Sequence, residues 1–257
     1  MNLSALFVLA GCAMREHARR HLLHVVVLLS LGAIGFAVGM SLLGGGAHTK
    51  ILKDMATGSL LLFGGTLAIA LSVVSIGPEV EARTILPVLA RPIHRSEYVI
   101  GRFLGTVGTA YLALAIMAVV FAAALLLMEH TVGAAFPLVL LFVAIEVALV
   151  AAIGTTLGVF CSPPLAGVLT FFVFFAGSVK IGYGTRLLER LGHGPAQIAL
   201  SLLLRPLPNL AAFDFRDALV HDLPVPGAYM AQVALYAVLY TAATLSVACW
   251  KFGGREL

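Results

Sequence analysis

The segment PEVEARTILPVLARPIHRSEYVIGR, residues 78–102, is the densest cluster of charge in the chain and lies between two long apolar runs. A charged side chain at the centre of a membrane span costs about 2.5–3.5 kcal/mol on insertion scales, so this segment must lie in water or against another protein. Its charged residues are Glu79, Glu81, Arg83, Arg91, Arg95, Glu97 and Arg102.

The apolar residues of the same segment predict a short helix. Leu86, Val88 and Leu89 recur among the charges at roughly helical spacing. Pro87 and Pro92 limit how far one helix can continue, because proline lacks a backbone N–H and clashes with the preceding turn. We therefore expect a short cytoplasmic helix, a break at the second proline and a turn into the next membrane span.

The composition identifies the chain as an integral membrane protein. Of its 257 residues, 61% are hydrophobic and 11% are charged, and the mean hydropathy is +1.05. Soluble domains carry about a quarter charged residues, so this chain is far too apolar to be one. Apolar runs of about 20 residues are long enough to cross a bilayer as helices. We expect an all-α fold and one transmembrane domain over residues 1–257.

Six apolar runs are candidates for membrane spans. Gly44–Gly46 ends the first run, and Ser162-Pro163-Pro164 forces a tight return after the fourth. A short polar loop with His48, Lys50 and Lys53 is expected between the first two spans. The predicted spans are about Leu22–Leu43, Ala56–Ile76, Tyr98–Met128, Phe136–Phe160, Leu165–Lys180 and Gly227–Trp250.

Small residues in two of these spans predict faces on which helices pack closely. Glycine lets two helix backbones approach each other, which is a common way for helices to associate in membranes. The second span carries Gly58, Gly64, Gly65 and Thr66, and the third carries Gly101, Gly105 and Gly108.

Two further segments are amphipathic rather than spanning. Residues 1–21 place an apolar stretch before their arginines, the reverse of a secretory signal, and predict a helix in the cytoplasmic interface. Residues 181–226 alternate leucines with charges, which predicts a segment that lies on, or dips into, the outer face.

Basic residues set the expected orientation. With the N terminus inside, the inner segments hold nine of the 16 lysines and arginines, and most of the others belong to the long 181–226 region, which is less informative. We therefore expect both termini in the cytoplasm. The net charge of +4 arises from arginines beside the spans, which favours anionic lipid headgroups over nucleic acid as the partner.

The charged segment resembles the first cytoplasmic loop of the permease subunits of type-2 ABC exporters. That family's order is an acidic residue, Gly-Thr, leucines, Pro, Arg and Gly-Lys. The chain departs from it at Arg83, where the family has glycine, and at Arg102, where it has lysine. The residues that follow the order are Glu81, Thr84, Ile85, Leu89, Arg91, Pro92, Ile93, Arg95, Tyr98, Gly101, Arg102 and Gly105.

The resemblance implies a function and its partners. The chain would form the substrate path of an exporter in a bacterial cytoplasmic (inner) membrane, paired with a second permease copy or a similar subunit. A separate ATPase would dock on a coupling loop at residues 78–98. The residues implied to contact that ATPase are Glu79, Glu81, Arg83, Thr84, Arg91, Pro92 and Arg95. The helix at residues 1–21 resembles the family's connecting helix, which also touches the ATPase, and residues 207–214 resemble a stretch before the last span in one branch.

Catalytic and cofactor motifs are missing from the sequence. It has no G-x-x-x-x-G-K-[ST] loop for nucleotide phosphates, so ATP and magnesium are expected in the partner ATPase, and no cofactor or metal in this chain. It also lacks the H-E-x-x-H and G-x-S-x-G signatures of hydrolases. Cys12, Cys161 and Cys249 show no pairing pattern and are expected to be free thiols.

Glu146 is an ionisable residue near the middle of the fourth predicted span. Such a group usually faces the bundle interior or a watery cavity and has a partner. It is either a cavity residue that senses cargo or gates the path, or a protonated or hydrogen-bonded residue of helix packing. The sequence leaves both readings open.

Two other functions are compatible with the sequence. A membrane-embedded lipid-modifying enzyme would use His193, Asp214, Asp217 and His221 beneath an amphipathic roof, since catalysis needs an acid or base within reach of the substrate. A membrane scaffold that transmits force without moving cargo is the third hypothesis.

Overall fold

The computed structural model describes residues 3–19, 21–43, 48–81, 94–129, 133, 135–179, 207–221 and 223–254. Within these ranges the chain is all-α, as predicted. The helices are α1 (Leu3–Ala18), α2 (His21–Leu43), α3 (His48–Glu81), α5 (Arg95–Glu129), α6 (Phe136–Phe160), α7 (Pro163–Val179), the short 3-10 helix η3 (Leu210–Phe213), α10 (Arg216–Val220) and α11 (Gly227–Gly253).

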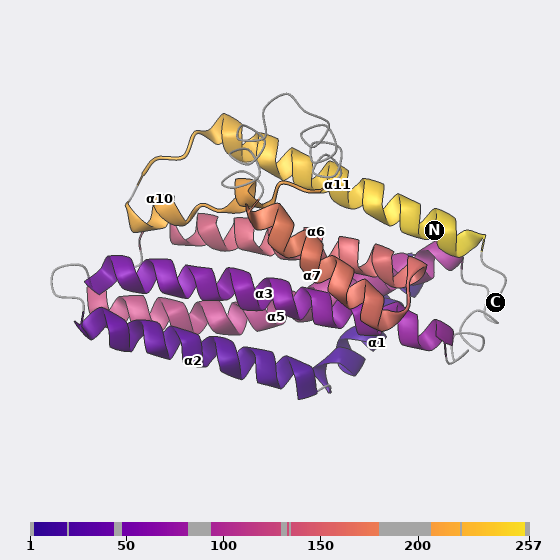
Figure 1. Ribbon diagram of the computed structural model, residues 1–257, viewed down its shortest axis with the longest axis horizontal. Helices are drawn as coiled ribbons and strands as arrows, with labels where there is room; N and C mark the ends of the chain where they lie inside the picture. The colour runs from indigo at the N-terminus through magenta and orange to yellow at the C-terminus, as the bar shows by residue number, and fades with distance from the viewer. Residues whose placement is uncertain are drawn as a thin grey trace, which may run out of the picture.

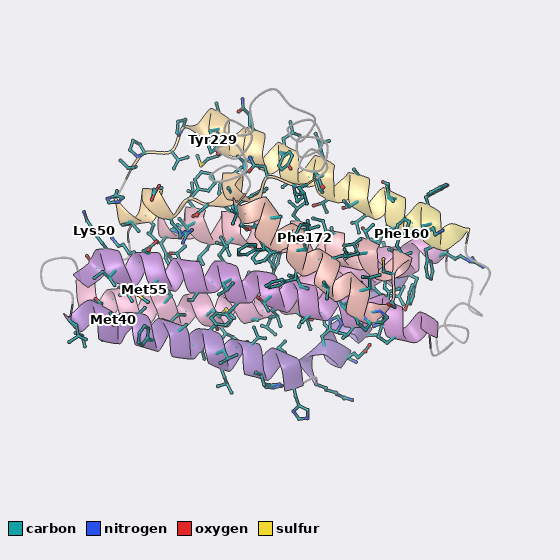
Figure 2. All side chains as sticks on the ribbon, in the orientation of Figure 1. Met40, Lys50, Met55, Phe160, Phe172 and Tyr229 are labelled. Atoms are coloured by element: carbon teal, nitrogen blue, oxygen red, sulfur yellow. The ribbon has the colours of Figure 1, made fainter. Side chains whose placement is uncertain are left out.

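The long helices run side by side in one elongated bundle (Figure 1). The end of the bundle that holds α1 and the last turn of α11 is called the terminal end. Phe160, at the end of α6, also lies there, whereas Met40 and Lys50 lie at the opposite end, called the far end (Figure 2). Helix α10 lies at the far end as well.

Five helices of the described chain are long and apolar enough to cross a membrane. The predicted fifth span, Leu165–Lys180, corresponds to α7, an apolar helix of 17 residues. At 1.5 Å per residue α7 is about 25 Å long, just short of a hydrocarbon core of about 30 Å. A sixth full span therefore stays a prediction. The five long spans are Leu23–Leu43, Thr49–Pro78, Arg95–Met128, Phe136–Phe160 and Gly227–Gly253.

The polar loop predicted around His48, Lys50 and Lys53 is wrong, because α3 begins at His48. Leu52 and Ala56, one turn apart, are both fully buried and place an apolar face on these first turns. Lys53 is buried too, because a lysine stem can lie along apolar surface. Helical packing thus extends past the point at which the apolar run becomes polar.

Helix α3 is the central helix of the bundle and packs against α2, α5, α6 and α7. Its glycines lie at these contacts, as the sequence predicts. A Cβ on Gly64 would lie 3.0 Å from Leu114 of α5 and 3.2 Å from Val147 of α6, and one on Gly65 would lie 2.6 Å from the ring of Phe174 of α7. The absence of side chains here lets three neighbours approach α3 closely.

The glycines of α5 form the surface against which α1 packs. A Cβ on Gly101 would lie 2.7 Å from Leu9, one on Gly105 would lie 2.8 Å from the carbonyl oxygen of Ala10, and one on Gly108 would lie 2.9 Å from the sulfur of Met14. The predicted packing face is therefore confirmed, and its partner is the N-terminal helix. The opposite side of α1 exposes apolar side chains such as Phe7 and Val8.

The chain returns from the terminal end to the far end between α6 and α11. Helix α7 starts beside the end of α3, where a Cβ on Gly77 would lie 2.9 Å from the ring of Pro163. Its last turn meets residues 207–210, since a Cβ on Gly177 would lie 2.8 Å from the carbonyl oxygen of Pro208. Helix α11 then runs back along α6 and α5 to the terminal end (Figure 1).

Candidate functional site

Three of the predicted coupling residues are described, and they fall at the terminal end, where α3 ends and α5 begins. Glu79 and Glu81 lie in the last turn of α3, and Arg95 is the first residue of α5. The remaining predicted coupling residues lie outside the described part of the chain: Arg83, Thr84, Arg91 and Pro92. Their contact with an ATPase stays a prediction.

The start of α5 is fixed by two polar contacts. The backbone N–H of His94 donates to a carboxylate oxygen of Glu97 at 3.2 Å, so the first turn of the helix is capped by its own acidic residue. The Arg95 guanidinium donates to the carbonyl oxygen of Gly253 at 3.2 Å, at the last residue of α11. Arg95, predicted as an ATPase contact, therefore also ties the entrance of α5 to the end of α11.

A second arginine ties α5 to α1. Arg102 donates to the carboxylate of Glu16 at 2.7 Å, and the Arg102 side chain is only 11% exposed. Its Nε donates to the Tyr98 hydroxyl oxygen at 3.3 Å, and the guanidinium lies 5.6 Å from the centre of the Tyr98 ring. A largely buried arginine that meets a carboxylate holds its geometry better than an exposed pair does.

An aromatic pair completes this connection. The rings of Tyr98 and Phe252 stack with centroids 5.7 Å apart, and both side chains are almost fully buried. Together with the arginine contacts, they join α1, α5 and α11 within two turns of the predicted coupling loop. The group Glu16, Arg95, Tyr98, Arg102 and Phe252 is called the terminal-end cluster.

At the far end, residues 207–221 form a cap across the bundle. The backbone N–H of Asn209 donates to the hydroxyl oxygen of Tyr236, on α11, at 2.9 Å. The Phe215 ring meets the Phe142 ring of α6 with centroids 4.2 Å apart. Leu210, Phe213, Phe215, Ala218 and Leu219 are all buried. The cap is thus packed into the bundle. The position of residues 181–226 at the outer face of the membrane stays a prediction.

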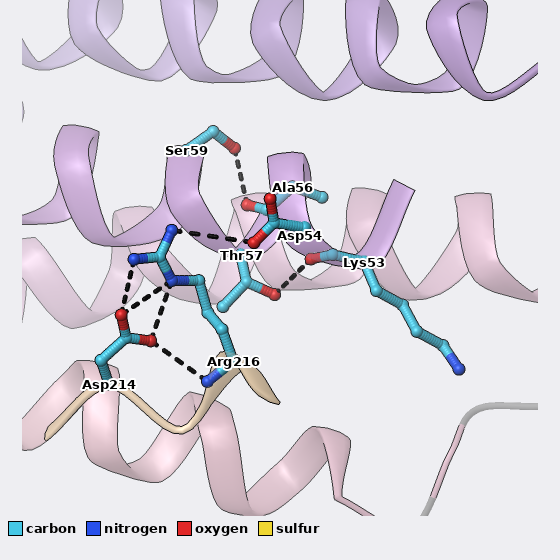
Figure 3. A network of polar contacts seen from close by, with 7 residues as sticks. All are labelled: Lys53, Asp54, Ala56, Thr57, Ser59, Asp214 and Arg216. Carbon is cyan, nitrogen blue, oxygen red and sulfur yellow. Dashed lines mark hydrogen bonds and ion pairs between the residues drawn. The ribbon is translucent and has the colours of Figure 1, made fainter. Parts of the chain in front are cut away.

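Arg216 is the polar centre of the cap (Figure 3). Its guanidinium binds both carboxylate oxygens of Asp214, with contacts of 2.5–2.9 Å, and lies 3.8 Å from Asp54 of α3. Gly58 makes room for it, since a Cβ there would lie 3.4 Å from the guanidinium. The hydrogen bonds to Asp214 raise the pKa of Arg216, and the charges of Asp214, Asp54 and Asp217 act in the same direction, against the effect of burial. Arg216 is therefore a permanent cation.

Glu146 lies in the bundle interior, close to the cap. It is 2% exposed, and neither carboxyl oxygen has a hydrogen-bond partner among the described residues. The charges of Asp214 and Arg216 are near enough to act on it. Glu146 does not line the apolar groove of about 170 Å³ between α5 and α6, which is formed by Tyr111, Leu114, Ala115, Ala118, Leu140 and Ala144. Its role as a cavity residue stays a prediction.

The described residues proposed for a lipid-modifying enzyme do not come together as an acid–base site. The carboxylate of Asp214 is paired with Arg216. Asp217, on α10, and His221, just after it, are exposed. His193 lies outside the described residues. Among the residues that the structure describes, no group of three or more His, Cys, Asp or Glu side chains could hold a metal ion, and Cys12, Cys161 and Cys249 are free thiols.

Sequence reasoning missed most partners of these site residues. The four-residue spacing of Tyr98 and Arg102 is a local signal that would have suggested their contact. Nothing in the sequence links Arg102 to Glu16 or Tyr98 to Phe252, because these partners are far apart in the chain and meet only after the helices pack.

Comparison with known protein families identifies the family of this chain. The family described as ABC-2 family transporter protein matches residues 33–257, which include every described helix except α1 and the first half of α2. No curated protein matches the chain.

Proposed function

Because the chain belongs to the ABC-2 family of transporter proteins, we propose that it is the transmembrane subunit of an exporter driven by a separate ATP-hydrolysing subunit. The family is a transporter component and not itself catalytic, and the apolar helices make this chain a multi-pass integral membrane protein. The observation that carries the proposal is this match over most of the chain, which includes the charged segment that the sequence singled out.

The proposed docking site for the ATPase is the segment between α3 and α5. It follows Glu81, the last residue of α3, and precedes His94, just before α5, at the terminal end. Charged residues that cannot stay in hydrocarbon are available there to meet a water-exposed partner. We assign Glu79, Glu81, Arg83, Thr84, Arg91, Pro92 and Arg95 to this contact, and the terminal end to the cytoplasm of a bacterial inner membrane.

The terminal-end cluster offers a route by which a push on this segment reaches other helices. Arg95 holds the end of α11, and Arg102 holds α1. Because both arginines lie in the first turns of α5, displacement of the loop would move α1, α5 and α11 together. Interactions within a packed, partly buried cluster transmit displacement better than isolated surface charges do.

The path for cargo is proposed to open at the far end. The cap contacts α3, α6, α7 and α11 there. A single chain encloses only half of the expected path, so we assign a second copy, or a similar subunit, to the other half. Apolar side chains of α11 such as Leu235, Val238 and Leu239 are exposed and available to lipid or to that partner.

Isolation of the complex from its native membranes tests this proposal. The tagged chain is purified in mild detergent and studied by native mass spectrometry and by ATP hydrolysis. We expect two permease chains with two copies of a subunit that carries a phosphate loop, and hydrolysis that depends on that subunit. A stable single permease that transports cargo without any ATP-hydrolysing partner would contradict the proposal.

A further inference from the structure

Glu146 is a buried carboxyl group that has no hydrogen-bond partner among the described residues. A buried carboxyl group is costly unless it is neutral, hydrogen-bonded or paired with a cation. The described residues provide neither oxygen of Glu146 with a hydrogen-bond partner. The hydroxyls of Thr155 and Thr156 on the same helix do not serve it, because they lie more than two turns away and donate to carbonyl oxygens one turn back.

The cation that acts on Glu146 is already committed to other carboxylates. Arg216 makes three hydrogen bonds from its guanidinium to Asp214 and also faces Asp54. Lys53 extends away from this group (Figure 3). Two carboxylates, those of Asp54 and Asp214, therefore already meet the one guanidinium that acts on Glu146. If Glu146 ionises, the local charge is negative and favours the entry of a further cation.

A group of aromatic rings begins one helical turn before Glu146. Phe142 is one helical turn before Glu146 on the same face of α6, and its ring meets Phe215 of the cap. Phe215 in turn lies against Tyr229 at the start of α11, with ring centroids 5.8 Å apart. Aromatic faces attract organic cations, and a carboxylate beside them supplies the opposite charge. The combination suits an apolar molecule with a positive centre.

We propose that Glu146 is the charge-selecting residue of the transport path and that it binds cargo carrying a positively charged group on an apolar body. The proposal rests on the proposed transport function and names its substrate class. In the described conformation Glu146 is buried, and the charge of Arg216 in the cap acts on it. Movement of the cap exposes Glu146 to cargo, whose cation then supplies the partner that the carboxyl group lacks.

Two probes of opposite charge and nearly equal size and shape test this assignment. Tetraphenylphosphonium and tetraphenylborate are measured for saturable binding to the full chain in nanodiscs, with empty nanodiscs of the same lipid subtracted. We expect the wild type to bind the cation, and Glu146→Gln to weaken that binding about tenfold or more, because the charged contact is lost. Glu146→Asp, which retains the charge, should keep the preference for the cation.

Asp217→Asn is the matched control, because it also exchanges one carboxylate for an amide at the far end, at an exposed position whose charge acts on Arg216, and so tests whether a general change of local charge is enough. Its cation binding should equal that of the wild type, and size-exclusion profiles should match for all variants. Equal cation binding by Glu146→Gln and the wild type would overturn the assignment. So would a preference for the borate, or no saturable binding of the cation to the wild type. The assay contains no ATPase, so such a failure is distinguishable from failure of the proposed function.

Discussion

At the scale of single residues, the packing of α1 on α5 depends on glycines. Gly101, Gly105 and Gly108 carry no Cβ, and α1 fills the space. Burial alone would not hold a short helix in this position, because one face of α1 remains exposed. The close fit of Gly105 against Ala10 and Ala13 is therefore the most sensitive point of this contact.

We predict that Gly105→Ala displaces α1 and destabilises the chain. The added methyl group would lie against Ala13 and 2.8 Å from the Ala10 carbonyl oxygen, and overpacking of this kind costs about 1–3 kcal/mol. The measurement is the apparent melting midpoint of the purified chain in detergent. Gly11→Ala, on α1 itself, has nothing within 4 Å of the added methyl and should be neutral or slightly stabilising. Equal midpoints for both variants would show that α1 does not pack as described.

At the scale of elements, the spans and packing faces could be predicted to different degrees. Periodic signals such as the α5 glycines identified a packing face, because small residues at helical spacing have few other uses in a membrane. They could not identify α1 as the partner. The start of α3 was predicted too late because its first turns carry Lys50 and Lys53, and composition does not show that Leu52 is buried beneath them.

The site was predicted less completely than the fold. The charge of residues 78–102 marked the segment where α3 gives way to α5, and the position of Glu146 within α6 marked it as buried. The Asp54–Arg216 contact could not be predicted, because it joins α3 to the cap across most of the sequence. Contacts of this kind depend on the packing of the helices, which no local pattern encodes.

The coupling segment provides the element-scale prediction. Glu81→Lys and Arg91→Glu should each uncouple the complex without unfolding the membrane domain. Charge reversal replaces attraction by repulsion at the proposed ATPase contact, with an expected cost of about 1–3 kcal/mol for a close pair. An exposed ion pair contributes under about 1 kcal/mol to folding stability, so the free permease should elute as the wild type does. Affinity pull-down should recover less ATPase, and normal recovery together with normal transport in both variants would place the contact elsewhere.

At the scale of the whole molecule, we propose that the terminal end is cytoplasmic and that the far end lies on the outer side of the membrane. The prediction is tested on a chain whose native cysteines, Cys12, Cys161 and Cys249, have been replaced. Single cysteines at Gly192 and Asp217 should react with a membrane-impermeant thiol reagent added outside intact cells. A cysteine at Gly254, which is exposed at the terminal end, should react only after the membrane is permeabilised. Labelling of the first two positions only from the cytoplasm would reverse the orientation.

The central claim is that a separate ATPase drives this chain through the segment between α3 and α5. Photo-crosslinking tests it most directly, with benzoylphenylalanine in place of Val88 in that segment or in place of Leu223, which is exposed at the far end. After irradiation of native membranes, the account predicts a crosslink from position 88 to a subunit that carries a phosphate loop, and none to that subunit from position 223. A crosslink to the ATPase from position 223 and not from position 88 would contradict it.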